Sequence, residues 1–85
     1  MFKPFDIVVL DRDLPAAGLQ KGDLGTVVEV YGPDGLEVEF VAASGRTQAL
    51  LTLKNADVRS VGDQDLVAVR RLPSDPSHAP LTRSE

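Results

Sequence analysis

The stretch Gly22-Asp-Leu-Gly-Thr-Val-Val-Glu-Val-Tyr-Gly-Pro-Asp-Gly-Leu-Glu-Val-Glu-Phe40 decides the fold. Residues 22–31 are rich in β-branched side chains, which favours a strand. Residues 36–40 alternate apolar and acidic side chains with the period of two that marks a half-buried strand. The turn sequence Gly32-Pro-Asp-Gly35 stands between them, and the whole stretch therefore predicts a β-hairpin.

The register of this hairpin depends on which side chains must be buried. A four-residue loop would place Glu29 on the apolar face. A three-residue loop instead pairs Val30 with Val38 and Val28 with Phe40. We expect this second register, because a slip of one residue inverts every side chain. The residues that then face outward are Glu29, Tyr31, Glu37 and Glu39.

Further short strands are expected on both sides of the hairpin. Residues 5–10 are apolar on both faces, as in a strand covered on both sides, and strands at 46–53 and 57–61 follow the hairpin after tight turns. Two points stay open from the residues alone. A local bulge would decide whether Val27 faces inward, and the apolar run 66–72 suits a strand or a short helix, its valines favouring the strand.

Five short strands with glycine turns between them predict a small barrel of the SH3 type, which limits exposed sheet edges. The expected fold is all-β: a five-stranded SH3-like barrel domain over residues 1–72, with a short extra C-terminal element. Residues 73–85 are rich in proline and serine and are expected to be a disordered tail. A chain of 85 residues fits one domain, whose small core predicts marginal stability that a partner or a homo-oligomer would raise.

Composition argues against several classes of function. The formal net charge is −4, whereas nucleic-acid-binding domains usually carry a basic surface, so nucleic acid is not the expected partner. There is no cysteine, and the single histidine, His78, lies in the tail, so we expect neither a metal site nor another cofactor. No apolar run approaches the ~20 residues of a membrane helix, and residues 1–4 show no signal pattern. We therefore expect a cytoplasmic protein without a membrane partner.

Two motifs resemble chemical sites but have plainer explanations. Gly22-Asp-Leu-Gly25 lacks the lysine and the hydroxyl of a phosphate-binding loop and precedes a strand, so turn geometry explains it better. Asp6, Asp11 and Asp13 flank a loop that also carries Arg12. This favours ordinary solvation over carboxylates tuned for catalysis or metal binding. We therefore expect no catalytic residue and no enzyme activity.

The outward face of the hairpin is the main candidate for binding. Its glutamates form either a solvated acidic face or a docking surface for a basic partner protein, with Tyr31 as an aromatic anchor. Loop 11–21 is a second exposed segment suited to recognition. Arg59, Arg70 and Arg71 form either a solubilising group or a basic patch that pairs with the acidic face of a neighbouring copy. The candidate partner-binding residues are Glu29, Tyr31, Glu37, Glu39, Asp11, Arg12 and Asp13.

Four segments follow one another in a characteristic order: Asp6-Ile-Val-Val-Leu10, Leu19-Gln-Lys-Gly-Asp-Leu-Gly-Thr-Val-Val28, Val38-Glu-Phe40 and Leu51-Thr-Leu53. In this order they resemble a family of small bacterial proteins described as domain of unknown function 4926. Residues 22–27 are also similar to the KOW-type glycine turn of SH3-like barrels. The resemblance implies an SH3-like fold and a small accessory protein, often encoded beside a second small protein as in toxin–antitoxin pairs. It implies no catalytic residues.

We therefore expect a non-enzymatic protein-binding module, a small bacterial accessory protein of the antitoxin or immunity type that acts by binding a partner protein. The alternative is a KOW-like module associated with RNA or the ribosome. Retention on RNA at low salt that is lost at moderate salt would favour the alternative, because phosphate contacts make binding salt-dependent.

Overall fold

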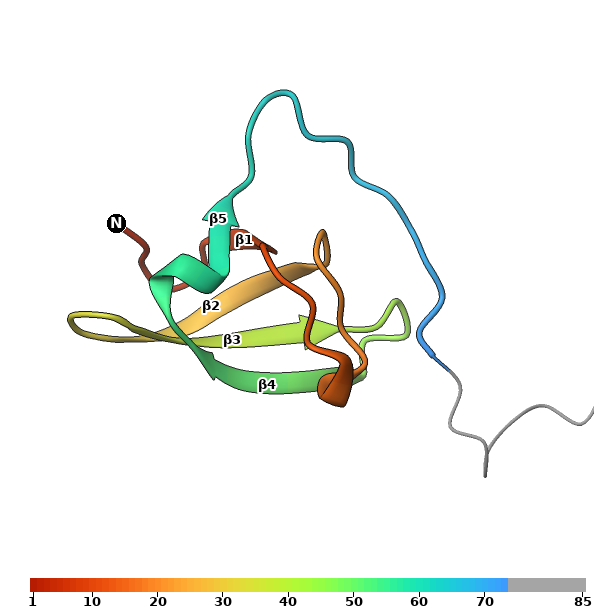
Figure 1. The fold of residues 1–85 in the computed structure, drawn as a ribbon, viewed down its shortest axis with the longest axis horizontal. Helices are drawn as coiled ribbons and strands as arrows, with labels where there is room; N and C mark the ends of the chain where they lie inside the picture. The colour runs from red at the N-terminus through yellow and green to blue at the C-terminus, as the bar shows by residue number, and fades with distance from the viewer. Residues whose placement is uncertain (74–85) are drawn as a thin grey trace, which may run out of the picture.

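The computed structural model describes residues 1–73, which form a single antiparallel sheet (Figure 1). The strands are β1 (Ile7–Leu10), β2 (Leu24–Tyr31), β3 (Gly35–Val41), β4 (Thr47–Leu53) and β5 (Val58–Ser60), and the 3₁₀ turns are η1 (Pro15–Ala17) and η2 (Asn55–Asp57). The order in space is β4-β3-β2-β1-β5, so the last strand returns to pair with the first. The predicted all-β fold with five strands is confirmed, while its closure as an SH3-like barrel stays a prediction.

The hairpin of β2 and β3 forms where the sequence predicts it, but in another register. Tyr31 lies opposite Gly35, so Val30 pairs with Leu36. The predicted pairing of Val30 with Val38 is therefore wrong. In this register Leu36 packs in the core. One extra residue nearer the start of β2 is then needed for Val27 to face the core as well.

A β-bulge at Val28 supplies that extra residue. The register shifts between Val27 and Glu29, and Val27 lies opposite Val38 and is fully buried. The predicted pair of Val28 with Phe40 is therefore wrong, and the open question about Val27 is settled, since it faces inward. A bulge lets two residues of one strand oppose one of the other. Glu29 consequently still faces outward, although Val27, two positions earlier, faces inward.

The core is made of apolar side chains and is centred on Phe40, which is almost completely buried. Gly25 in β2 makes room for this ring. A Cβ atom at Gly25 would lie 2.8 Å from Cε2 of Phe40 and 2.7 Å from Cγ1 of Val38. The sequence predicted a turn at this glycine. It instead lies within β2, where the absence of a side chain lets Val38 and Phe40 pack against the backbone. The buried core residues are Val8, Leu10, Leu19, Val27, Leu36, Val38, Phe40, Leu53 and Val58.

The apolar run 66–72 forms neither the predicted strand nor a helix. It belongs to an irregular segment, residues 61–73, that follows β5 and arches away from the sheet (cyan to blue in Figure 1). We call this segment the strap. The predicted tail falls, beyond Pro73, on residues outside the described part of the chain. None of the helical turns within residues 1–73 has the length and apolar character needed to cross a membrane.

Candidate functional site

The outward residues of the hairpin share one face of the sheet with a side chain of β4. Glu29 lies directly opposite Glu37, and Leu50 lies opposite Glu39. Tyr31 is half exposed and lies two residues from Glu29, so it points to the same side. The four hairpin residues predicted to face outward thus gather on one surface, which we call the acidic face. It consists of Glu29, Tyr31, Glu37, Glu39 and Leu50.

Two carboxylates of the acidic face are held in place by threonines of β4. Thr52 donates a hydrogen bond from Oγ1 to Glu37 at 2.7 Å, and Thr47 donates one from Oγ1 to Glu39 at 2.5 Å. A hydroxyl donor orients a carboxylate and leaves its charge in place. The side chains of Glu37 and Glu39 are therefore held in place by β4.

No cation compensates the charge of the acidic face within residues 1–73. Glu29 and Glu37 lie directly opposite each other, and like charges in that position destabilise a sheet by about 0.2–1 kcal/mol. A cationic partner would reverse the sign of this contribution. The five ion pairs of the described residues all use aspartates: Lys3–Asp6, Arg12–Asp57, Lys21–Asp11, Arg59–Asp65 and Arg70–Asp23.

The predicted loop residues Asp11, Arg12 and Asp13 make contacts within the loop and with η2. The backbone N–H of Lys21 donates to Asp13 at 2.8 Å, and Arg12 donates to Asp57 at 3.2 Å. No hydrogen bond or ion pair within residues 1–73 joins this loop to the acidic face. The seven predicted residues therefore form two separate groups. In the same part of the chain, no three acidic or histidine side chains gather as a metal site.

The strap is a second surface, and reasoning from the sequence missed it. Its two ends are tied to the rest of the protein by arginine–aspartate pairs. Arg59 in β5 donates two hydrogen bonds to the carboxylate of Asp65, at 2.9 and 3.0 Å. Arg70 donates two to Asp23, at 2.9 and 2.5 Å, and one to the carbonyl of Gly18 at 3.0 Å. Such two-point contacts fix geometry as well as charge, so the strap is anchored at both ends.

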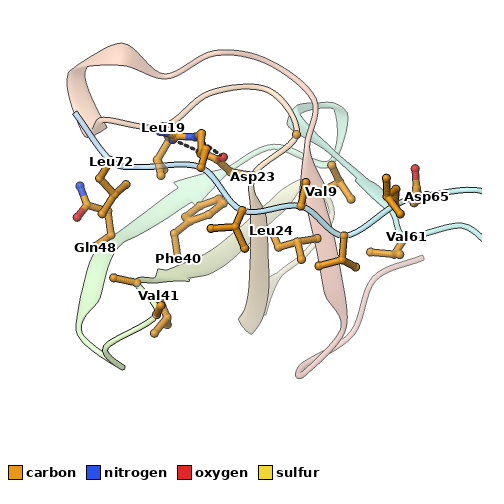
Figure 2. Close-up of a pocket in the computed structure, with 18 of the residues that line it drawn as sticks. Val9, Leu19, Asp23, Leu24, Phe40, Val41, Gln48, Val61, Asp65 and Leu72 are labelled. Carbon is orange, nitrogen blue, oxygen red and sulfur yellow. Dashed lines mark hydrogen bonds and ion pairs between the residues drawn. The ribbon is translucent and has the colours of Figure 1, made fainter.

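A pocket of about 540 Å³ lies between the strap and the sheet (Figure 2). Its sheet side includes Val9, Leu24 and Phe40. Val9 is only 5% exposed, although it alternates with the core residues Val8 and Leu10 and so points to the other face of β1. The two apolar faces of the first strand were the signal for this pocket, since one packs on the core and the other lies beneath the strap.

The Arg59–Asp65 pair leads to a prediction about acid titration. Hydrogen bonds from Arg59 and from the backbone N–H of Gly62 lower the pKa of Asp65 from 3.8 to about 2, and desolvation opposes them with a lesser effect than either. Because this pKa is lower in the folded protein, the pair favours the anchored strap at pH values above 3.8 and loses its effect as the pH falls toward about 2.

We expect the side-chain carboxyl ¹³C signal of Asp65 to titrate in NMR with a midpoint near pH 2 in the wild type. The same signal in Arg59→Gln should titrate closer to 3.8, because the largest cause of the lowered pKa is removed. A wild-type midpoint near 3.8 would show that the pair does not form in solution.

The family model described as "Domain of unknown function (DUF4926)" matches residues 5–60. The chain belongs to the DUF4926 family. The matched residues contain all five strands of this DUF4926 sheet, together with Asp23 and Arg59, while the strap lies beyond them. The resemblance found in the sequence is therefore confirmed. Comparison with curated proteins gave no significant match, and neither did comparison with solved structures.

Proposed function

We propose that this DUF4926 protein is a non-enzymatic protein-binding module that docks a basic partner protein on its acidic face. The observation that carries the proposal is the set of three outward glutamates without an ion-pair partner among residues 1–73. A role as a small bacterial accessory protein of the antitoxin or immunity type fits a module that acts only by binding.

The acidic face combines the features that a docking surface needs. Glu37 and Glu39 are held by threonine hydroxyls, so little side-chain freedom is lost when a partner binds. Tyr31 and Leu50 are both about half exposed and supply apolar contact area beside the charges. Aromatic residues commonly anchor interfaces, and complementary charge steers the approach of the partner.

The substitution Glu29→Lys tests this proposal, because Glu29 lies directly opposite Glu37 and the two carboxylates repel each other. In the free protein the new lysine faces Glu37, so the free energy of unfolding should stay the same or rise by about 0.5 kcal/mol. Binding of the partner should nevertheless weaken by about tenfold. The matched control is Asp63→Lys, which changes an exposed residue of the strap by the same charge.

Partner binding is measured by immobilising the three proteins and quantifying what each retains, by mass spectrometry, from cells that carry the gene. We expect a protein that the wild type and Asp63→Lys retain, that Glu29→Lys loses, and that high salt releases. Equal retention by Glu29→Lys would refute docking on the acidic face. Retention of RNA instead of protein would support the RNA- or ribosome-associated alternative. Against that alternative, Arg12, Arg59 and Arg70 are already paired with aspartates.

A further inference from the structure

The middle of the strap exposes large apolar side chains. Leu66, Val67 and Val69 are 90, 72 and 97% exposed, although all three also border the pocket beneath the strap. On the sheet side, Leu24 and Val41 are partly exposed around the same pocket. Large apolar side chains that are exposed around one pocket are typical of a contact site on a folded protein.

The backbone in the middle of the strap is also free to pair. Within the described part of the chain, no backbone hydrogen bond involves residues 66–69, and the last one before them joins the N–H of Asp65 to the carbonyl of Gly62. Backbone N–H and C=O groups that become buried need partners. An extended peptide that lies alongside can supply such partners, as in the recognition modes that add a strand to an exposed backbone.

The charges around the pocket restrict what can bind there. The four charged residues that line it, Asp23, Arg59, Asp65 and Arg70, are joined in two pairs with each other. The pocket therefore offers no unpaired charge among its described residues, and it favours an uncharged segment. Its volume of about 540 Å³ is in the range of pockets that enclose a ligand, about 300–1,000 Å³.

We propose that the groove between the strap and the sheet binds an uncharged, extended segment of a partner protein. Aliphatic side chains at alternate positions of that segment enter the pocket over Val9 and Leu24. Its main chain forms hydrogen bonds with the backbone of residues 66–69. The two arginine–aspartate pairs, Arg59–Asp65 and Arg70–Asp23, hold the strap beside this pocket. This site differs in chemistry from the acidic face and does not depend on the docking of a basic partner there.

Selection from a phage library of random dodecapeptides tests this site with the full chain. We expect the wild type to select uncharged peptides with aliphatic residues at alternate positions. Leu24→Gln should weaken a selected peptide by at least about tenfold in fluorescence anisotropy. Leu50→Gln is the matched control, because Leu50 is also a partly exposed leucine on a strand of the same sheet but lies on the acidic face. It should leave the peptide's affinity unchanged.

Two further measurements make the result decisive. N-methylation of alternate amides of the selected peptide should abolish binding if the main chain pairs with the strap, and Arg70→Gln should weaken binding by releasing one end of the strap. Selection of basic peptides that Glu29→Lys loses and Leu24→Gln keeps would overturn the proposal and assign recognition to the acidic face. Failure to select any peptide would also overturn it. A concentration-dependent dimer that Leu24→Gln abolishes would replace the partner segment with a second copy of the chain.

Discussion

A methyl group added at Gly25 should lower the free energy of unfolding by about 2 kcal/mol. The added Cβ would lie 2.7 Å from Cγ1 of Val38 and 2.8 Å from Cε2 of Phe40, distances that packed carbon atoms do not adopt. Both neighbours are fully or almost fully buried, so neither can move without disturbing the core. Overpacking of this kind typically costs 1–3 kcal/mol, which exceeds the gain of about 0.5–1 kcal/mol from replacing a strand glycine.

Urea denaturation of Gly25→Ala measures this loss, and Gly62→Ala is the matched control. Gly62 lies in the exposed strap, and the nearest atom to an added Cβ is Oδ2 of Asp65 at 3.6 Å, an ordinary contact. The control should therefore remain within about 0.5 kcal/mol of the wild type. Wild-type stability of Gly25→Ala would contradict the packing of Phe40 under β2. Phe40→Leu should cost less stability in Gly25→Ala than in the wild type, because it removes one of the two clashing atoms.

The hairpin was predictable because its sequence repeats with a period of two, but its register was not. Positions 27 and 28 are both valine, so the alternation does not show which of the two faces the core and which lies in a bulge. The structure resolves the choice by burying Leu36 opposite Val30 and inserting the bulge at Val28. Both registers place Leu36, Val38 and Phe40 on one face and differ in which valines of β2 lie opposite them. That choice depends on packing in the complete core rather than on the local sequence.

The candidate sites differ in predictability for a related reason. The outward orientation of the hairpin glutamates follows from the alternation of apolar and acidic residues alone. The wrong pairing of the two strands does not change it, because the glutamates stay on the face opposite the core. The strap instead depends on Arg70 reaching Asp23, 47 positions earlier in the chain. An irregular segment held by two side-chain pairs has no periodicity to detect. Val9, an apolar residue on the face of β1 that points away from the core, was the one local sign that another segment covers that face.

Replacing Phe40 with alanine should have the largest effect on stability of any single substitution in the hairpin. Phe40 is among the largest of the fully buried side chains, and truncation of a buried phenylalanine costs about 3–5 kcal/mol. A folded region of about 70 residues has a total stability of roughly 4–10 kcal/mol. Phe40→Ala should therefore populate the unfolded state at room temperature, which the loss of amide dispersion in an ¹H–¹⁵N NMR spectrum would show.

Tyr31→Ala provides the comparison, because Tyr31 is an aromatic residue of the same hairpin that faces solvent on the acidic face. It should cost about 0.5 kcal/mol. If Phe40→Ala proves too unstable to purify, Phe40→Leu keeps the comparison measurable, with an expected cost of about 1–2 kcal/mol. A larger loss for Tyr31→Ala than for Phe40→Leu would mean that the hairpin buries its opposite face. In that case Glu29 and Glu37 would lie inside the protein, and the acidic face would not exist as a docking surface. The two aromatic substitutions thus test the fold and the proposed function through the same assignment of faces.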